Sequence, residues 1–268
     1  MQLIRMNKKM LKQNNSTIFS GRTGLAVEAD ELSYRYPDGT LALQNIHLRV
    51  KTGEKVAVTG PNGSGKSTLI TLLNGVRRGN GRLKIFDIPV NKHDLTLVKQ
   101  KVGLIFQNPD DQLFCPTIFE DVAFGPLNLG LSREKVEQRV KEALHSVGLN
   151  GYEQRSSFHL SYGERKLASI ATVIAMQPQL IAADEPTSNL DLAHRRKIIQ
   201  WFKTCRQTVV MTTHDLDMAL ETCDRVIVLH RGKIVADGAT RQILTDQNLL
   251  ERYQLELPLS LQASRAKS

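Results

Sequence analysis

The most informative stretch of the sequence is a nine-residue run that can bind phosphate, Gly60-Pro61-Asn62-Gly63-Ser64-Gly65-Lys66-Ser67-Thr68. It fits the pattern G-x-x-x-x-G-K-[ST] at every fixed position. Its three glycines let backbone N–H groups turn inward around the α- and β-phosphates of a nucleotide, and Lys66 can reach the β- and γ-phosphates. The hydroxyl of Ser67 can bind Mg²⁺. The run therefore predicts a phosphate-binding loop.

A pair of adjacent acidic residues follows an apolar stretch further along the chain. Residues 180–183 read as a strand, and Asp184 and Glu185 come directly after it. We expect Asp184 to hold Mg²⁺ through the shell of hydroxyl and water oxygens of a phosphate-loop site. Glu185, one residue further on, could orient and deprotonate an attacking water. Two carboxylates with different roles suit hydrolysis.

The elements around these residues are of the kinds that would position them. Residues 54–59 alternate as a strand that leads into the phosphate-binding loop, and residues 66–74 have helical spacing before Gly75 ends the helix. This order of strand, loop and helix is the context that the motif requires. Upstream, residues 25–36 and 43–50 alternate as the two strands of a hairpin joined by a Pro-Asp-Gly turn.

The rest of the chain divides into a helical part and an alternating part. Residues 82–90 read as one strand interrupted at a proline, and residues 102–106 as a short buried strand. Residues 112–175 turn helical, and within them Ser132 is an N-cap candidate for a helix that Gly148 closes. Strands and helices then alternate again. The expected strands are 180–183, 208–211, 226–229 and 234–236, and the expected helices are 192–202 and 216–221, with a helical tail after them.

Composition places the chain among ordinary globular proteins. It has 268 residues, 41% of them hydrophobic, and no apolar run approaches the roughly 18 residues that a membrane-spanning helix needs. Three widely separated cysteines argue against a disulfide framework and against a zinc site, which fits a reducing cytoplasm. The net charge of +9 suits a nucleotide and an anionic membrane surface. Because no nucleic-acid-binding motif accompanies that charge, we expect no nucleic-acid partner.

Two further stretches have simpler interpretations. Residues 1–24 carry basic residues and no acidic one, so we expect a flexible basic N-terminal arm. The arm could contact anionic lipid, or it could be a solvated tail or lie upstream of an alternative start at Met6 or Met10. The run Asn91-Lys92-His93-Asp94 matches a guanine-reading pattern of GTPases, but it follows the phosphate-binding loop too soon. We interpret it as a surface loop.

A segment ahead of the acidic pair carries the resemblance to a known family. Leu160-Ser161-Tyr162-Gly163-Glu164 resembles the L-S-G-G-Q signature of ATP-binding-cassette proteins, from which Tyr162 and Glu164 depart. Further motifs occur in the family's order, and the resemblance covers residues 25–238. These motifs are Tyr36 as the adenine-stacking aromatic of the A-loop, Gln107 as the Q-loop, residues 188–191 with Asp191 as the D-loop, and His214 as the switch histidine.

The resemblance implies a fold and a composite active site. The fold is the α/β fold of P-loop NTPases of the ATP-binding-cassette type, with a mixed sheet core, an antiparallel β subdomain and an α-helical subdomain. The ATPase domain would span residues 25–240, with the helical subdomain at approximately 112–175 and a helical C-terminal tail over 241–268. ATP would lie in a head-to-tail dimer, between the phosphate-binding loop of one subunit and residues 161–164 of the other. Ser161 is a natural N-cap, so the helix that starts there can direct its N–H groups at the γ-phosphate.

Roles for individual residues follow from the same resemblance, with ATP and Mg²⁺ as the implied cofactors. ATP would be bound by Tyr36 and by Gly60, Pro61, Asn62, Gly63, Ser64, Gly65, Lys66, Ser67 and Thr68. The signature residues that act in trans would be Ser161, Tyr162, Gly163 and Glu164, of which Gly163 permits close backbone approach. The catalytic set would be Glu185 as base, His214 at the γ-phosphate, Lys66 and Gln107. Mg²⁺ would be held by Ser67, Gln107 and Asp184.

A narrower resemblance concerns the segment after the Q-loop. Residues 107–114 and 121–130 are similar to the ATPase subunits of energy-coupling-factor importers, including the cobalt and nickel type. In that subgroup the segment forms a short helix near a transmembrane coupling protein, and Pro109 with two following aspartates suits a helix start. The resemblance implies a peripheral subunit at the cytoplasmic face of the cell membrane. It would form a homodimer, or a heterodimer with a second cassette ATPase, and would work with a transmembrane coupling subunit and a substrate-binding membrane subunit to import a metal ion or vitamin.

Other functions stay open on the sequence. The departures at Tyr162 and Glu164 fit a regulatory, weakly active subunit that pairs with a different, active ATPase. The chain could also drive a transporter of non-metal cargo, or an exporter, which the segment at residues 108–112 disfavours. A cassette ATPase of DNA repair or translation would need a long coiled-coil insert or a second cassette, and the sequence has neither.

Overall fold

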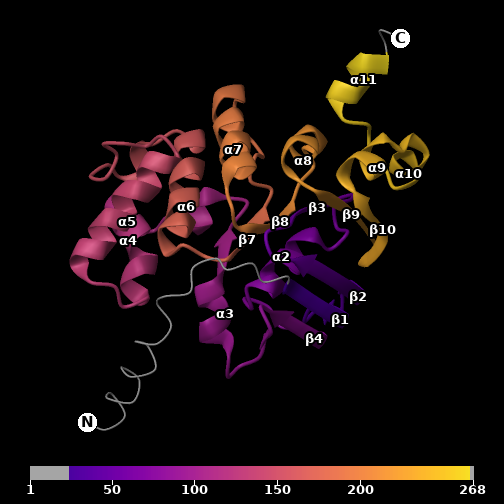
Figure 1. The fold of residues 1–268 in the computed structure, drawn as a ribbon, viewed down its shortest axis with the longest axis horizontal. Coiled ribbons are helices and arrows are strands. Elements are labelled where there is room, and N and C mark those ends of the chain that lie inside the picture. The colour runs from indigo at the N-terminus through magenta and orange to yellow at the C-terminus, as the bar shows by residue number, and fades with distance from the viewer. Residues whose placement is uncertain (1–23, 266–268) are drawn as a thin grey trace.

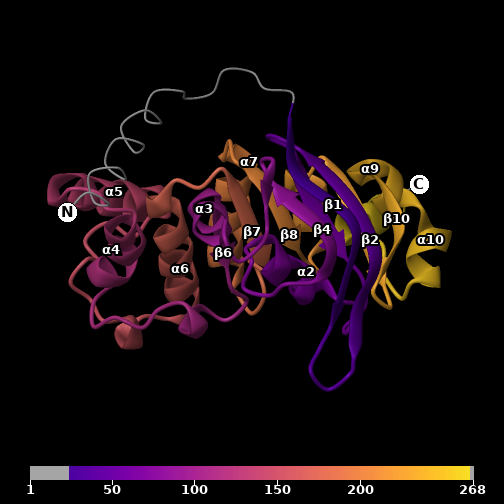
Figure 2. The same ribbon diagram turned by 90° about the horizontal axis from the view of Figure 1, so that it is seen from below.

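The chain folds into two sheets with helices around them (Figure 1). The computed structural model describes residues 24–265, so the basic arm expected over residues 1–24 lies, apart from Gly24, outside the described residues. One sheet has four antiparallel strands in the order β2-β1-β4-β5, and the other has six strands in the order β10-β9-β3-β8-β7-β6. The helices α4, α5 and α6 lie beyond the β6 edge of the larger sheet (Figure 2).

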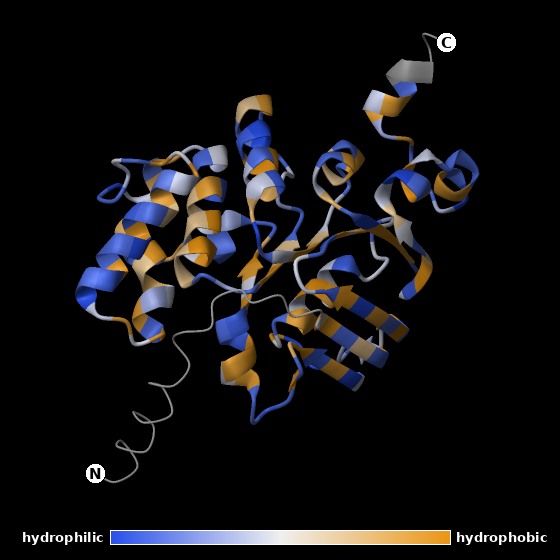
Figure 3. Ribbon diagram, viewed as in Figure 1, coloured by the Kyte–Doolittle hydropathy of each residue, from blue (hydrophilic) through white to orange (hydrophobic). Residues whose placement is uncertain are grey.

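The smaller sheet contains the hairpin that the sequence predicts ahead of the phosphate-binding loop. Strand β1 (Leu25–Arg35) pairs with β2 (Leu41–Lys51) on one side and with β4 (Asn80–Ile85) on the other. Hydrophobic and hydrophilic residues alternate along these strands (Figure 3). One face of the sheet is therefore buried in the core while the other meets water.

The prediction of a single strand over residues 82–90 is wrong. The structure has two strands there, β4 and the short β5 (Ile88–Pro89), which pair antiparallel as a hairpin. Phe86 and Asp87 form the two-residue turn with φ angles of 47° and 65°. Two successive left-handed residues are the geometry that reverses a chain between antiparallel strands, and neither Phe86 nor Asp87 is the glycine that would signal it. Pro89 therefore lies in β5, after the turn, and does not cause the interruption between the two strands.

The larger sheet gathers the chemistry-bearing segments at one edge. Strands β3, β8, β7 and β6 are parallel neighbours, and β9 is parallel to β3, while β10 runs antiparallel to β9. Because the carboxyl ends of parallel strands meet at one edge, the loops that follow these four strands lie side by side. The strands are β3 (Lys55–Thr59), β6 (Val102–Ile105), β7 (Leu180–Asp184), β8 (Thr208–Thr212), β9 (Arg225–His230) and β10 (Lys233–Ala239).

The helices cover the larger sheet and build a separate helical layer. Helix α6 packs against α4 and α5 in that layer and also against β6, so it joins the layer to the sheet. None of the helices in residues 24–265 is both long and apolar enough to cross a membrane. The helices are α2 (Lys66–Leu73), α3 (Leu95–Lys101), α4 (Ile118–Asn128), α5 (Arg133–Ser146), α6 (Tyr162–Met176), α7 (Leu192–Thr204) and α8 (Leu216–Thr222), with 3-10 turns η1 (Pro109–Asp111) and η2 (Ser157–His159).

Helix α3 was not expected from the sequence, and the run interpreted as a surface loop begins it. Asn91 accepts hydrogen bonds from the N–H groups of His93 (2.8 Å) and Asp94 (3.0 Å) through its Oδ1 atom. Asp94 is the N-cap residue of α3. The short polar side chains at positions 91 and 94 thus shape a helix start, which is a common use of Asn and Asp outside any nucleotide site.

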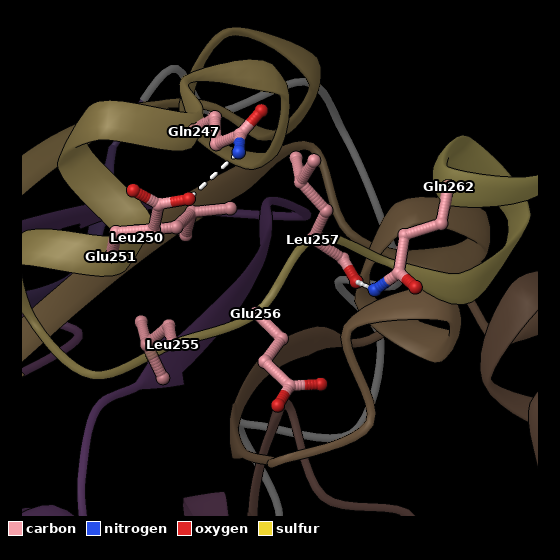
Figure 4. A pocket seen from close by; sticks show the side chains of 7 residues that line it. All are labelled: Gln247, Leu250, Glu251, Leu255, Glu256, Leu257 and Gln262. Carbon is pink, nitrogen blue, oxygen red and sulfur yellow. Dashed lines mark hydrogen bonds between the residues drawn. The ribbon is translucent and has the colours of Figure 1, made fainter. Parts of the chain in front are cut away.

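The C-terminal residues form three short helices, α9 (Thr240–Thr245), α10 (Gln247–Arg252) and α11 (Leu259–Arg265). Residues 255–257 pass between α10 and α11, beside a shallow pocket (Figure 4). There Gln262 donates a hydrogen bond to the carbonyl of Leu257 at 2.6 Å. Asp217 of α8 accepts the N–H groups of Leu259 (3.0 Å) and Ser260 (3.1 Å), which attaches α11 to the body of the protein.

The packing of β6 against α6 can be tested at Gly103. A Cβ atom added at Gly103 would collide with the side chains of Val173 and Pro178. We expect Gly103→Ala to lower the free energy of unfolding by about 1–3 kcal/mol, because an overpacked core must shift to make room. Urea unfolding followed by circular dichroism measures the change. Gly24→Ala is the control, because no atom lies near its Cβ position. Equal stability of the two variants would contradict the packing described.

Candidate functional site

Four loops meet at the carboxyl edge of the larger sheet. The phosphate-binding loop follows β3, and His214 follows β8. Asp184 ends β7 and Glu185 comes directly after it, while Gln107 follows β6 by two residues. The predicted site residues of these four segments, far apart in the sequence, are therefore brought to one edge by the order of the strands.

The phosphate-binding loop is packed so tightly that two of its glycines cannot be replaced. Gly60 has a φ of 148° and Gly65 a φ of 105°. A Cβ atom would meet the carbonyl of Leu229 at Gly60 and the carbonyl of Ala42 at Gly65. The loop is thus pressed against the β9 end and against β2, which fixes its shape and leaves its N–H groups at the start of α2.

Lys66 lies inside the loop that precedes it. Its Nζ atom donates to the carbonyl of Gly60 at 2.8 Å and to that of Pro61 at 3.1 Å, and its side chain is buried. Burial lowers the pKa of Lys66, while the negative charges of Glu185 and Asp184 oppose that shift. A cation is therefore held in the loop, where it can turn from two carbonyls to the phosphates of a bound nucleotide.

The two carboxylates at the end of β7 have different surroundings. Asp184 is buried and accepts the hydroxyl of Thr212 at 2.5 Å. Glu185 has a left-handed backbone with a φ of 45°, and its N–H donates to the carbonyl and the hydroxyl of Thr212. Such a conformation costs about 1–3 kcal/mol for a residue other than glycine and is concentrated at functional sites. The Glu185 carboxylate lies next to His214.

One oxygen of Glu185 is held and the other has no hydrogen bond. Oε2 accepts the hydroxyl of Ser188 at 3.1 Å and the N–H of His214 at 3.2 Å. Oε1 accepts no hydrogen bond within residues 24–265, although His214 Nε2 lies 3.4 Å from it. A buried carboxylate oxygen without a hydrogen bond is costly unless a ligand or water completes it. The position fits a base that receives a proton from water.

The oxygen donors at this edge suit Mg²⁺. Ser67 has an exposed hydroxyl at the start of α2, and α2 packs against β7, which ends at Asp184. The hydroxyl of Ser67 and the carboxylate of Asp184 are hard oxygen ligands of the kind that Mg²⁺ prefers. Gln107 is different, because its side chain is exposed and no hydrogen bond joins it to these groups in the part of the chain described.

Tyr36 reaches the phosphate-binding loop from the β1–β2 hairpin. Its hydroxyl and that of Thr68, the last residue of the loop, are 2.9 Å apart. The guanidinium of Arg77 lies 4.9 Å from the centre of the Tyr36 ring. The ring of Tyr36 thus lies beside the last residue of the phosphate-binding loop, and the Arg77 guanidinium lies over it.

The signature-like segment starts α6 with a complete capping box. Ser161 accepts the N–H of Glu164, and Glu164 accepts the N–H of Ser161 at 2.8 Å. Glu164 also accepts the hydroxyl of Tyr152 at 2.7 Å. Because glutamate and glutamine both complete a capping box, the departure from the family pattern at Glu164 keeps the helix start intact.

The other signature positions make contacts within the same chain. A Cβ atom at Gly163 would collide with the imidazole of His194, whose Nδ1 is 2.6 Å from a carboxylate oxygen of Asp191. Asp191 also caps α7 by accepting the N–H of His194 at 2.9 Å. The D-loop and the signature segment therefore touch through one histidine. In residues 24–265 no hydrogen bond or ion pair joins residues 161–164 to the phosphate-binding loop of this chain.

Several residues of the site were missed by the sequence analysis. Thr212 holds both Asp184 and the N–H of Glu185, and Ser188 binds the Glu185 carboxylate although it was predicted only as part of the D-loop. A threonine two residues before His214 was the available signal for Thr212. His194 carried no signal, because only the fold brings it to Gly163.

Comparisons of sequence relate the chain to a family of ATP-binding proteins. Residues 43–188 match the model of the family described as ABC transporter. A putative ABC transporter ATP-binding protein of Gloeobacter violaceus is 52% identical over 235 residues, which cover 87% of this chain and 96% of that protein. An energy-coupling factor transporter ATP-binding protein of Methanothermobacter thermautotrophicus is 46% identical over 238 residues, which cover 87% of this chain and 76% of that protein.

Solved structures with the same fold include cassette ATPases. The structure of cbiO1 from Clostridium perfringens, described as part of the ABC transporter complex cbiONQ, has a TM-score of 0.76 and 30% identity, and the match covers 91% of this chain and 99% of cbiO1. A dimeric ATP-binding cassette in a post-hydrolysis state, bound to ADP and Pi, has a TM-score of 0.73 and 30% identity, with 80% and 99% covered.

The capping box of α6 can be tested at Glu164. We expect Glu164→Ala to lower the free energy of unfolding by about 1 kcal/mol, because the N–H of Ser161 and the hydroxyl of Tyr152 lose their acceptor, and Glu164→Gln to lower it less. The measurement is urea unfolding at about pH 7.

The hydrogen bond from Tyr152, followed by that from the Ser161 N–H, lowers the pKa of Glu164 in the folded chain. Its contribution is therefore present above the unfolded pKa of about 4.3 and is lost as the pH falls through the lower folded value. The difference between wild type and Glu164→Gln should shrink in that acid range, and a difference that grows there would contradict the assignment.

Proposed function

This chain belongs to the ABC transporter family as an ATP-binding subunit with ATPase activity, and from that premise we propose that it powers an importer of the energy-coupling-factor type. The observation that carries the proposal within the chain is Glu185, whose buried Oε1 accepts no hydrogen bond in residues 24–265 and whose charge acts on Lys66 of the phosphate-binding loop. The similarity to an energy-coupling factor ATPase and to cbiO1 supports the importer subgroup.

ATP binding would use the loop and the helix that follows it. The N–H groups at the start of α2 and the ammonium of Lys66 would bind the β- and γ-phosphates, with Lys66 leaving its two loop carbonyls. Tyr36 would stack on the adenine. Mg²⁺, bound by Ser67 and Asp184, would neutralise phosphate charge that develops during the reaction. The role of Gln107 as a further contact to Mg²⁺ and water belongs to this proposal.

Hydrolysis would depend on the groups around Glu185. Its Oε1 would accept a proton from the water that attacks the γ-phosphorus, while Ser188 and the His214 N–H keep Oε2 in place. The His214 imidazole, 3.4 Å from Oε1, would support the γ-phosphate. Thr212 binds the carboxylate of Asp184 and the backbone N–H of Glu185, so it is a positioning residue for the pair.

The complete site would require a second subunit. Residues 161–164 make no hydrogen bond or ion pair with the phosphate-binding loop of their own chain, as described above, and the N-terminus of α6 is an anion-binding helix end. We propose a head-to-tail dimer, with itself or with a second cassette ATPase, in which each α6 faces the nucleotide of the other subunit. Tyr162 lies at this surface, and its hydroxyl is turned to the Gln107 carbonyl of its own chain at 3.5 Å.

An exposed apolar patch marks the surface where a membrane partner would bind. Phe114, Phe124 and Leu127 are 66%, 50% and 57% exposed, and the two phenylalanine rings meet edge to face with centres 5.1 Å apart. Asp121 fixes the patch by accepting the N–H groups of Phe114 and Cys115 at 2.9 Å each. Exposed aromatic clusters of this kind are typical of protein interfaces. The coupling subunit would hold the chain at the cytoplasmic face of the membrane.

The cargo would be chosen by another chain. Within residues 24–265 no group of three or more His, Cys, Asp or Glu side chains is arranged to hold a metal ion. In keeping with the resemblance to energy-coupling-factor ATPases, we assign recognition of the cargo, a cobalt or nickel ion or a vitamin, to a substrate-binding membrane subunit. Transport of radiolabelled cobalt, nickel and vitamins by vesicles containing the assembled complex identifies the cargo. ATP-dependent export of all these cargoes, without import, would reject the importer.

Replacement of the proposed base tests the hydrolysis mechanism. We expect Glu185→Gln to keep ATP affinity and to lower kcat by about 10²–10⁴-fold, because an amide cannot accept the proton. Phosphate release gives kcat, and binding of a fluorescent ATP analogue gives affinity. With ATP, this variant should also accumulate as a dimer in light scattering. Glu137→Gln, at an exposed position on α5, is the control. Full turnover by Glu185→Gln would reject the assignment.

The apolar patch can be tested separately from catalysis. We expect Phe114→Ser combined with Phe124→Ser to weaken binding to the membrane subunits by at least about tenfold, because two aromatic contacts are lost at the interface. ATP hydrolysis by the isolated chain should stay near the wild-type rate. Leu97→Ser on α3, which is 49% exposed, removes a comparable apolar side chain outside the patch. Equal binding by the two variants would place the partner elsewhere.

A further inference from the structure

A buried lysine on α6 holds the main chain at Gln107. The side chain of Lys166 is fully buried, and its Nζ atom donates to the carbonyl oxygens of Phe106 (2.6 Å) and Gln107 (2.8 Å). No carboxylate lies within ion-pair distance of Lys166 in residues 24–265. Burial lowers the pKa of Lys166 to about 8, against the opposing charges of Asp184 and Glu185. Burying an amine is costly, and a methionine would fill the same space without that cost.

Two neighbours on the same helix strengthen this attachment. The hydroxyl of Tyr162 is also directed at the carbonyl of Gln107, at 3.5 Å. Arg165 forms an ion pair with Asp110 through Nε at 3.0 Å, and its guanidinium lies 5.9 Å from the Tyr162 ring. A glycine, which the signature pattern has at position 162, offers no side chain for such a contact. The departure from the pattern therefore adds a link between α6 and the Q-loop.

The other end of the Q-loop segment is attached to α6 as well. Gln112 donates through Nε2 to the carbonyl of Ser169 (2.8 Å) and to the hydroxyl of Thr172 (2.7 Å). Its Oε1 accepts the N–H of Phe106 at 3.2 Å, which closes residues 106–112 into a compact loop. The loop thus has contacts with α6 at its beginning, its middle and its end.

We propose that Lys166 and Tyr162 are positioning residues, which hold the Gln107 carbonyl and so fix the point from which the Gln107 side chain reaches the nucleotide. The Q-loop and the first turns of α6 then move as one body. A partner that displaces the loop at residues 107–114 displaces Ser161 with it. This inference rests on the proposed catalytic role of Gln107, and it adds that the role depends on two side chains of α6.

Removal of the amine gives the first test. We expect Lys166→Met to lower kcat for ATP hydrolysis by about tenfold or more. The substitution removes the two hydrogen bonds from the Lys166 ammonium to the carbonyls of Phe106 and Gln107, so the Gln107 side chain is no longer held where it can act on the reacting groups. The KM for ATP should change by less than about twofold, because Lys166 makes no hydrogen bond to the phosphate-binding loop. Lys141→Met, at an exposed position on α5, controls for the loss of one positive charge. A loss confined to KM would overturn the proposal.

A double-mutant cycle with Gln107→Ala tests whether Lys166 acts through Gln107. If it does, Lys166→Met lowers kcat no further once the Gln107 side chain has been removed. Independent effects that multiply in the double variant would overturn the proposal. Tyr162→Phe removes one hydroxyl from a half-buried side chain and leaves the core unchanged, so the variant should fold. It tests the contribution of the second contact to the Gln107 carbonyl. We expect it to lower kcat by about twofold in the wild-type background and to leave kcat unchanged in the Gln107→Ala background.

A measurement that needs no hydrolysis separates this inference from the proposed function. The amides of residues 111–113 are hydrogen-bonded within the loop, to the carbonyls of Asn108 and Pro109. Hydrogen exchange of these amides in the nucleotide-free chain should become at least about tenfold faster in Lys166→Met. If the wild-type chain had no ATPase activity, the proposed function would be rejected. The exchange rates would still show whether Lys166 attaches the Q-loop to α6. Unchanged exchange in Lys166→Met would overturn the inference even in an active ATPase.

Discussion

The parallel pairing of β3, β8, β7 and β6 is the constraint on which the site depends. It places the ends of four separate strands at one edge, where the phosphate-binding loop, His214, the carboxylates and Gln107 follow in turn. Thr212 then refines the arrangement, since its hydroxyl and carbonyl hold the two residues at the end of the neighbouring β7. Loss of register between β7 and β8 would therefore separate the base from its support as well as weaken the sheet.

Helix α6 is the second organising element, because it connects the helical layer to this edge. Its N-terminus carries the signature-like segment, its second turn carries Lys166, and its later residues bind Gln112. The apolar patch at Phe114 and Phe124 lies on the same layer, a few residues from the Q-loop. Helix α6 thus packs against α4, which carries part of the surface proposed for the membrane partner, and its own N-terminus is proposed to face the nucleotide of the second subunit. Binding of the membrane partner and binding of nucleotide between the two subunits could therefore influence each other through α6.

The departures from the family signature have different physical meanings. Glu164 preserves the capping box that glutamine would make, so the start of α6 keeps its geometry. Tyr162 adds a side chain, and that side chain is turned to the Q-loop of its own subunit. Gly163, which matches the signature, is required by the imidazole of His194, which leaves no room for a Cβ atom. A regulatory subunit with a degraded signature is therefore less well supported than a cassette in which the segment keeps its structure.

The sequence by itself determined the motifs and most of the elements that carry them. The phosphate-binding loop, the acidic pair and the hairpin at residues 25–51 were predictable because glycine, carboxylate and alternation patterns are local. Only the tertiary structure decided the turn at Phe86 and Asp87, the left-handed backbone of Glu185 and the contacts of Lys166 and His194. The turn was missed because it lacks the glycine that would signal it, whereas the other features arise where segments distant in the chain pack together, and a local pattern does not show which segment will be the neighbour.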